Sequence, residues 1–256
     1  HEILNKAGFI SDMDGVIYRG NKVLPGVPEF IQWMKDNNKK FIFLTNSPER
    51  TPQELSMKLK RMGLDVSPDH FYTSAMATAE FIASQCPDCT AYVIGEPSLT
   101  KAMYDQGIYM NDVNPEYVVL GETRTYCFEK VEKAIELVNK GAKLIGCNPD
   151  TIGIMEKSVI PATGSLIAPI EIATGKKAYF VGKPNPLMLR SGLKRLGCHG
   201  SEIAFIGDRM DTDIIAGIES NIDTVLVLSG VTTMADVDNF PYRPKYIVNG
   251  VGDLIK

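Results

Sequence analysis

The stretch Phe9-Ile10-Ser11-Asp12-Met13-Asp14-Gly15-Val16-Ile17-Tyr18 decides the fold of this chain. Its short apolar run predicts a buried strand. Ligands of open α/β sheets bind outside the carboxyl ends of the strands, which makes Asp12 and Asp14 candidate site residues. Their i, i+2 spacing puts both side chains on one side of an extended backbone. Carboxylates this close repel each other unless a cation or a proton compensates. The alternative is a solvated Asp-x-Asp-Gly turn.

The composition of the chain sets the class of protein. The 256 residues are 44% hydrophobic and 23% charged, an ordinary globular composition for one large or two small domains. A formal net charge of −4 indicates no strongly basic face, so we expect no nucleic-acid polymer as partner. No stretch approaches the ~18 apolar residues of a membrane span. No charged and apolar leader is visible at the start, so we expect a cytoplasmic protein without a membrane partner. An oligomer is compatible with the sequence.

The cysteines indicate neither a disulfide framework nor a zinc site. Their number, five, is odd, and their spacings form no disulfide framework. Cys86-Pro87-Asp88-Cys89 is a lone C-x-x-C, whereas a structural zinc needs four ligands. No second pair of cysteines or histidines is near in sequence, so we expect no metal or redox role here. This cysteine usage agrees with a reducing, cytoplasmic compartment.

Strand and helix patterns alternate along the whole chain. The first part predicts β-α-β-α-β-α, which calls for a parallel sheet. Thr51 is a good helix N-cap, with Pro52 at N1 and Glu54 at N3. The middle of the chain alternates in its own right, so we expect a second small α/β domain there. Strands are predicted at 41–44, 71–73, 91–94, 117–120, 143–147, 178–182, 202–206, 224–228 and 246–248. Helices are predicted at 27–37, 51–62, 75–85, 98–106, 128–140, 164–174, 187–196 and 214–219.

Polar groups of complementary kinds follow four of the predicted strands. They are Asp12 with Asp14, Thr45-Asn46-Ser47, Lys183, and Asp208 with Asp213. In one parallel sheet these groups would converge on a single edge. Clustered carboxylates suit a hard cation, and Mg²⁺ is typically held by one or two carboxylates plus phosphate oxygens. Thr45, Asn46 and Lys183 can donate hydrogen bonds to those oxygens.

In these residues the sequence resembles the haloacid dehalogenase (HAD) superfamily, in its NagD-like, nitrophenylphosphatase-like branch. The family motif D-x-D-G-[TV] is matched by Asp12 to Val16, and the Ser/Thr at a strand end by Thr45. Lys183 matches the motif lysine in a Gly-Lys-Pro setting. The segment from Gly207 to Asp213 matches the G-D-x-x-x-T-D motif. The resemblance covers nearly the whole chain. It implies a Rossmann-like parallel-sheet core of residues 1–79 and 179–256, with residues 80–178 inserted as a large α/β cap of the C2 type.

The resemblance also implies a role for each motif residue in a phosphatase reaction. Asp12 would be the nucleophile that forms an aspartyl phosphate, and Asp14 the general acid and base. Mg²⁺ would bind Asp12, the main-chain carbonyl of Asp14, and Asp208. Asp213 would orient a metal-bound water or Lys183. Phosphate and substrate contacts would come from Thr45, Asn46, Lys183 and Arg209. The expected enzyme is thus a magnesium-dependent hydrolase of small phosphomonoesters such as nucleoside monophosphates, sugar phosphates and p-nitrophenyl phosphate.

In the cap, the residues that follow predicted strands are candidates for leaving-group contacts. They are Glu122, Arg124, Asn148 and Asp150, for which a helix cap or a surface charge is the alternative. For the whole protein, the competing functions are a receiver-like phosphoryl acceptor, a non-catalytic phosphometabolite sensor and a dehalogenase. A receiver is about half this length and has no Asp at the Asp14 position. Asp14 and Asp208 argue for phosphate over a halogenated substrate.

Overall fold

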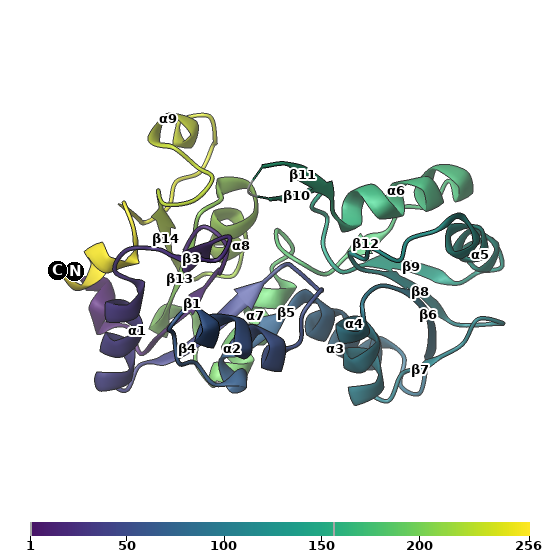
Figure 1. The fold of residues 1–256 in the computed structure, drawn as a ribbon, viewed down its shortest axis with the longest axis horizontal. Helices are drawn as coiled ribbons and strands as arrows, with labels where there is room; N and C mark the ends of the chain where they lie inside the picture. The colour runs from purple at the N-terminus through teal and green to yellow at the C-terminus, as the bar shows by residue number, and fades with distance from the viewer. Residues whose placement is uncertain (1, 156) are drawn as a thin grey trace. The chain divides into compact units, whose positions relative to one another are not determined.

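The computed structural model describes residues 2–155 and 157–256, which form two compact units. The first unit holds the residues through Thr45, then Pro52–Tyr72 and Lys183–Lys256. The second unit holds Asn46–Thr51 and Thr73–Gly182. The fold is α/β, and the first unit is a parallel-sheet core into which the second unit is inserted, as predicted (Figure 1). The predicted limits of core and cap, at 79/80 and 178/179, stay a prediction.

The first unit is built on a six-stranded sheet with the order β15-β14-β13-β1-β4-β5. The pairs of β1 with β13 and β4, of β13 with β14, and of β14 with β15 are parallel. All four residues of β1 are buried, because a strand inside a parallel sheet is covered on both faces. The strands are β1 (Gly8–Ser11), β4 (Lys40–Thr45), β5 (Phe71–Thr73), β13 (Ile203–Gly207), β14 (Asp223–Val227) and β15 (Tyr246–Val248).

Helix α1 (Val27–Asp36) shows how the sequence pattern produces the packing of this unit. Val27, Phe30, Ile31 and Met34 are buried, at the spacing of one helix face. The ring of Phe30 meets that of Phe9 in β1 edge-on, with 5.5 Å between centroids. The other elements are η1 (Glu2–Asn5), β2 (Tyr18–Arg19), β3 (Lys22–Val23), α2 (Pro52–Arg61), η2 (Pro68–His70), α7 (Leu187–Leu196), η3 (Gly200–Glu202), η4 (Met210–Ile214), α8 (Ile215–Glu219), α9 (Met234–Val237) and η5 (Val251–Ile255).

The second unit has a five-stranded sheet of its own with the order β12-β9-β8-β6-β7, and the pairs along it are parallel. Figure 1 shows α5 and α6 on one side of this sheet and α3 and α4 on the other. The strands are β6 (Thr90–Ile94), β7 (Tyr109–Met110), β8 (Tyr117–Leu120), β9 (Lys143–Gly146) and β12 (Tyr179–Phe180). The helices are α3 (Ser74–Gln85), α4 (Pro97–Asp105), α5 (Phe128–Asn139) and α6 (Thr163–Thr174).

Several elements differ from the sequence prediction. The strand before Lys183, β12, pairs with β9 in the second sheet and so does not belong to the core sheet. An antiparallel hairpin of β10 (Ile152–Ile154) and β11 (Val159–Pro161) was not predicted. A π-helical turn, η4, comes before α8, where the pattern predicted that a helix begins at residue 214. The pairing of β12 depends on a strand that is distant in the sequence, which local periodicity does not encode.

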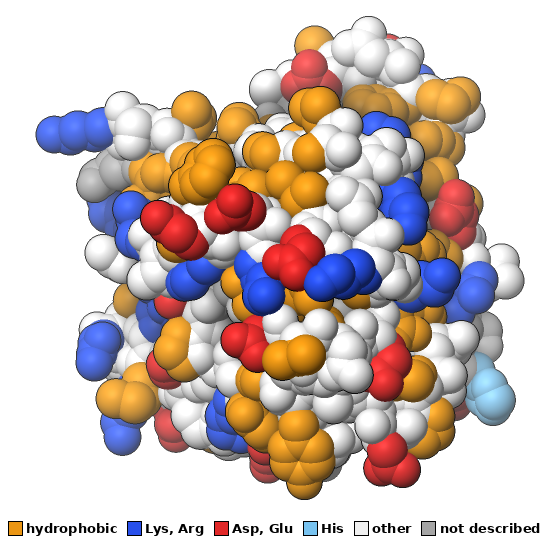
Figure 2. All heavy atoms as spheres, turned by 90° about the vertical axis from the view of Figure 1, so that its right-hand side faces the viewer, with side chains coloured by type: hydrophobic (Ala, Val, Ile, Leu, Met, Phe, Trp, Pro, Cys, Tyr) orange, Lys and Arg blue, Asp and Glu red, His pale blue; other side chains and the backbone are white. Residues whose placement is uncertain are grey.

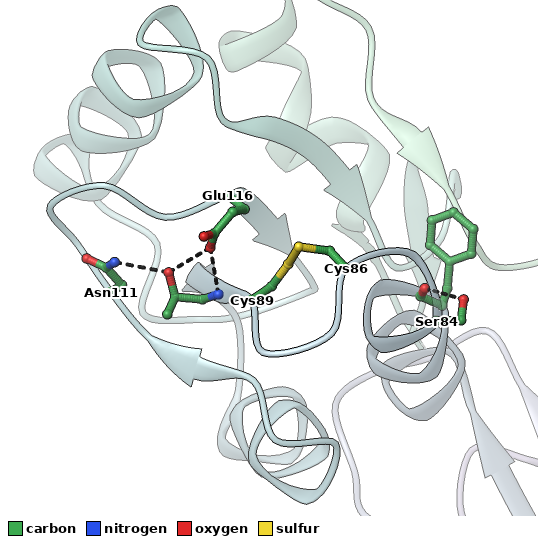
Figure 3. The surroundings of a disulfide bond; sticks show 7 residues. Ser84, Cys86, Cys89, Asn111 and Glu116 are labelled. Atoms are coloured by element: carbon green, nitrogen blue, oxygen red, sulfur yellow. Dashed lines mark hydrogen bonds between the residues drawn. A yellow bond between two sulfur atoms is a disulfide. The ribbon is translucent and has the colours of Figure 1, made fainter.

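Cys86 and Cys89 form a disulfide bond between the end of α3 and the start of β6 (Figure 3). This bridge was not predicted from the cysteine spacing. Beside it, Glu116 accepts hydrogen bonds from the backbone N–H and the hydroxyl of Thr90, at 2.7 and 2.9 Å. Asn111 donates to the same hydroxyl at 3.0 Å. The start of β6 is therefore held by side-chain bonds as well as by its strand pairing.

One face of the molecule carries mixed charges (Figure 2). The face in Figure 2 shows Lys and Arg side chains interspersed with Asp and Glu, and apolar side chains between them. Among the described residues, every helix is too short or too polar to cross a lipid bilayer.

Candidate active site

Asp12 and Asp208 lie side by side because the strands that precede them are paired in register. Ser11 is aligned with Ile206 across the parallel pair β1 and β13. The backbone N–H of Asp12 donates to the carbonyl of Ile206 at 2.9 Å, which carries the alignment to the strand end. The side chain of Asp12 is 14% exposed and Asp208 is buried. The carboxyl ends of two central strands thus present two carboxylates to one point.

Asp213 is a buried anchor for the residues around it. One of its carboxylate oxygens, Oδ2, accepts the backbone N–H groups of Asp208 and Arg209, at 3.0 and 3.1 Å. The turn of η4 brings the side chain of Asp213 back to the end of β13, where a Cβ at Gly207 would lie 2.3 Å from the Cβ of Asp213. Glycine at position 207 is therefore required for this approach.

Lys183 joins the carboxylates although its strand belongs to the other sheet. Its Nζ lies 3.1 Å from Oδ1 of Asp12 and 2.8 Å from Oδ1 of Asp213, and its side chain is 2% exposed. Burial alone would lower the pKa of Lys183, but Asp12 and Asp213 outweigh burial and raise it. Lys183 is thus held as a cation, and it ties the connection between β12 and α7 to the end of β1.

Negative charge exceeds positive charge in this cluster. Burial, and then the charge of Asp213, raise the pKa of Asp12 well above its usual range, and Lys183 opposes them. Burial and Asp213 raise the pKa of Asp208 to about 7. Carboxylate oxygens of Asp12, Asp208 and Asp213 lie within 4.8 Å of one another. Three carboxylates face one ammonium, and a hard cation with oxygen ligands fits this donor set. Both oxygens of Asp213 already accept hydrogen bonds, Oδ1 from Lys183 and Oδ2 from two backbone N–H groups, whereas Oδ2 of Asp208 accepts from the backbone N–H of Val231 at 2.9 Å.

Two glycine-containing turns close around Asp208, and the second of them, at Ser229-Gly230, is not among the predicted site residues. A Cβ at Gly15, whose φ is +79°, would lie 2.4 Å from Asp208 Oδ2, and one at Gly230 would lie 2.0 Å from it. Ser229 donates its hydroxyl to the carbonyl of Gly15 at 2.8 Å. Arg19 donates to the carbonyls of Ser229 and Gly230, at 2.9 Å each. The signal was present, because Ser229-Gly230 directly follows a predicted strand.

The other predicted residues of the first unit are placed as follows. Asp14 is exposed, whereas Met13 before it is buried, as expected for side chains that alternate. Thr45 is buried at the end of β4, two residues beyond Phe43, which is aligned with Ser11. The guanidinium of Arg209 makes two hydrogen bonds to Asp211, at 3.1 and 3.0 Å.

Three of the four candidate cap residues meet in the second unit, and Asn46 joins them. Asn148 donates to Asp150 at 2.7 Å and to Glu122 at 3.3 Å, and Asn46 also donates to Asp150, at 3.0 Å. Burial, and then the neighbouring carboxylate of Glu49, raise the pKa of Glu122 to about 7. The fourth candidate, Arg124, is exposed and is not part of this group of hydrogen bonds.

Comparison with known proteins places this arrangement in a family. Residues 9–109 match a model described as haloacid dehalogenase-like hydrolase, and residues 180–254 match a HAD-hydrolase-like model. Dihydroxyacetone phosphatase of Corynebacterium glutamicum is 47% identical over 246 residues, which cover 96% of this chain and 90% of that protein. Ribonucleotide monophosphatase NagD of Escherichia coli K12 is 41% identical over 245 residues, 96% of each chain. The crystal structure of a 4-nitrophenylphosphatase from Thermotoga maritima superposes with a TM-score of 0.94 at 35% identity, over 99% of this chain and 98% of that one.

The chain belongs to the haloacid dehalogenase superfamily. Within it, the protein lies in the NagD-like branch and is a phosphoric monoester hydrolase of the HAD type. The predicted family, fold class and enzyme class are thereby confirmed. All three relatives named above are phosphatases, which favours a phosphatase over the receiver, sensor and dehalogenase alternatives.

Proposed function

We propose that this phosphatase is magnesium-dependent and hydrolyses small-molecule phosphomonoesters through an aspartyl phosphate formed on Asp12. One observation carries the proposal: Lys183 is buried against Asp12 and Asp213, beside a second strand-end carboxylate, Asp208. Such a cluster preorganises charge for phosphoryl transfer, where positioning and electrostatic stabilisation supply most of the rate.

In the proposed reaction, the carboxylate of Asp12 attacks phosphorus and the bond from phosphorus to the leaving oxygen breaks. Asp14 donates a proton to that oxygen and then takes one from the water that hydrolyses the aspartyl phosphate, which releases inorganic phosphate. Lys183 stabilises the ionised, nucleophilic form of Asp12 and the phosphoryl oxygens. Thr45, Asn46 and Arg209 are proposed to hold the phosphate and the edge of the substrate.

The cation would be held by Asp12, Asp208 and the main-chain carbonyl of Asp14, with Asp213 orienting the groups around it. When bound, it would neutralise charge on the phosphoryl oxygens. The inserted unit is proposed to act as the cap, with leaving-group contacts from Glu122 or Asp150, because Asn148 is buried. Triose phosphates, ribonucleoside monophosphates and p-nitrophenyl phosphate are proposed as substrates, because relatives are named for these classes.

The first experiment measures release of nitrophenol from p-nitrophenyl phosphate, with Mg²⁺ and with excess EDTA, followed by a panel of triose and nucleoside phosphates. We expect turnover well beyond one equivalent that is lost in EDTA. Asp12→Asn is expected to abolish turnover, whereas the matched surface variant Asp238→Asn retains it. Acid quenching during turnover, followed by intact-mass measurement, should find one phosphoryl group on the wild-type protein. Metal-independent turnover, or an active Asp12→Asn variant, would overturn the proposal.

A further inference from the structure

The segment that follows Thr45 is held by the inserted unit. Asn46–Thr51 groups with Thr73–Gly182, although the residues on both sides of it belong to the first unit. The hydroxyl of Ser74, at the start of α3, donates to the carbonyl of Asn46 at 2.6 Å. The hydroxyl of Ser98, in α4, donates to the carbonyl of Pro48. Thr45 and Asn46 are neighbours in the chain, yet the packing that orients each of them comes from a different unit.

Asp150 holds the side chain of Asn46 and is itself held in place. Oδ2 of Asp150 accepts from Nδ2 of Asn46 at 3.0 Å and from Nδ2 of Asn148 at 2.7 Å. The amide of Asn148 is oriented in turn by the hydroxyl of Thr163, which donates to Asn148 Oδ1 at 2.7 Å. Both Asn148 and Thr163 are fully buried, at 1% and 0% exposure. The carboxylate that receives Asn46 therefore sits at the end of a rigid chain of hydrogen bonds.

Gly182 confines the other side of the same amide. A Cβ at this position would lie 2.8 Å from Oδ1 of Asn46 and 2.7 Å from the carbonyl oxygen of Cys147. The backbone N–H of Gly182 donates to that carbonyl at 2.7 Å, which keeps Gly182 close to the residue that follows β9. Any larger residue would push the amide away. Asn46 is thus confined between Asp150 and the residue that precedes Lys183.

We propose that Asp150 is a positioning residue for the phosphatase reaction, which fixes the direction in which the Asn46 amide donates to the phosphoryl group. The proposal rests on the proposed function. An amide nitrogen carries two N–H groups, so a carboxylate that accepts one of them sets the direction of the other. The bond to a carboxylate also polarises the amide and makes it a stronger donor. Asp150 acts through Asn46, because a carboxylate in direct contact with a phosphate would repel it.

The test is a double-mutant cycle with Asn46→Ala, Asp150→Ala and the combined variant, with Asp112→Asn as a surface control in the same unit. The readouts are the inhibition constant of inorganic phosphate, kcat and KM for p-nitrophenyl phosphate, and Tm. We expect Asp150→Ala to raise the phosphate inhibition constant about tenfold, which corresponds to about 1.4 kcal/mol. Asp150→Asn keeps an acceptor oxygen and should recover most of the loss. In the Asn46→Ala background, Asp150→Ala should add nothing.

Two results would overturn the inference. One is a phosphate inhibition constant of Asp150→Ala equal to that of wild type. The other is a full Asp150→Ala effect that persists in the Asn46→Ala background, since Asp150 would then act independently. If Asp150→Ala does not fold, Asp150→Ser, whose hydroxyl is one bond too short to reach Asn46, replaces it in the cycle with the same expectation. A wild-type protein inactive on every phosphate ester would defeat the proposed function, whereas an active one with no coupling would defeat this inference alone.

Discussion

Replacing Lys183 by methionine tests the charge cluster directly. The substitution keeps much of the apolar stem and removes an ammonium that is 2% exposed and lies within 3.1 Å of two carboxylates. The carboxylate of Asp213 is 0% exposed and that of Asp12 is 14% exposed, so both lose their counter-charge away from bulk water. Removal of one partner from a buried ion pair costs about 3–5 kcal/mol in the free energy of unfolding. At about 2–4 °C per kcal/mol, the expected fall in Tm is about 6–20 °C.

The assay is thermal unfolding by calorimetry and circular dichroism, in EDTA and in saturating Mg²⁺. Lys256→Met is the control, because Lys256 makes an exposed pair with Asp253 at 2.7 Å and such pairs contribute roughly 0–1 kcal/mol. Mg²⁺ should raise the Tm of Lys183→Met more than that of wild type, since the variant has more uncompensated negative charge. A Lys183→Met protein that unfolds in EDTA at the same temperature as the Lys256→Met control would refute the reasoning.

Three further predictions follow from the same geometry. Asp213→Asn should fold but bind Mg²⁺ about 10–100-fold more weakly in isothermal titration. The reason is that the single oxygen of an amide cannot accept the hydrogen bonds of Lys183 and of two backbone N–H groups together. An unchanged affinity for Mg²⁺ would contradict this. The pKa of Glu122 in the folded state is raised to about 7. Ionisation of Glu122 therefore lowers the stability of the fold as the pH rises from the ordinary pKa of a glutamate towards 7. Glu122→Gln should therefore be more stable than wild type at about pH 8, by at most about 3 kcal/mol, and as stable as wild type at about pH 4. Denaturant titrations that show the same difference in stability at both pH values would contradict the raised pKa of Glu122. The double variant Cys86→Ser with Cys89→Ser should lose about 2 kcal/mol in the free energy of unfolding, as expected for a disulfide that closes a loop of this length. Thiol labelling of wild-type protein that is unfolded but not reduced should modify three of its five cysteines, and labelling of all five would contradict the disulfide.

Most elements of this fold were predictable because their signals are local. The apolar run before Asp12 became the central strand, and the Thr51-Pro52 start of α2 was correctly placed, since capping and periodicity depend on neighbouring residues. The proximity of Asp12 and Asp208 could be predicted from the sequence, because the carboxyl ends of strands in a parallel sheet lie at one edge.

Lys183 shows where this reasoning failed although the residue was right. Its strand pairs in the second sheet, yet its ammonium reaches Asp12 and Asp213. The assumption that all four strand ends belong to one sheet was therefore wrong. Strand order depends on which apolar faces pack together, and the periodicity of a single strand is the same in either sheet.

By itself, the sequence determined the class of fold, the family and the four charged residues that the structure brings together, Asp12, Lys183, Asp208 and Asp213. Those follow from periodicity and motif spacing, which are properties of short stretches. Only the tertiary structure decided that Asp213 holds Lys183 and two backbone N–H groups, and that Asn46 is held by Asp150, 104 residues away. A hydrogen bond requires its atoms to meet within a fraction of an ångström, and for distant residues that depends on the packing of the whole chain.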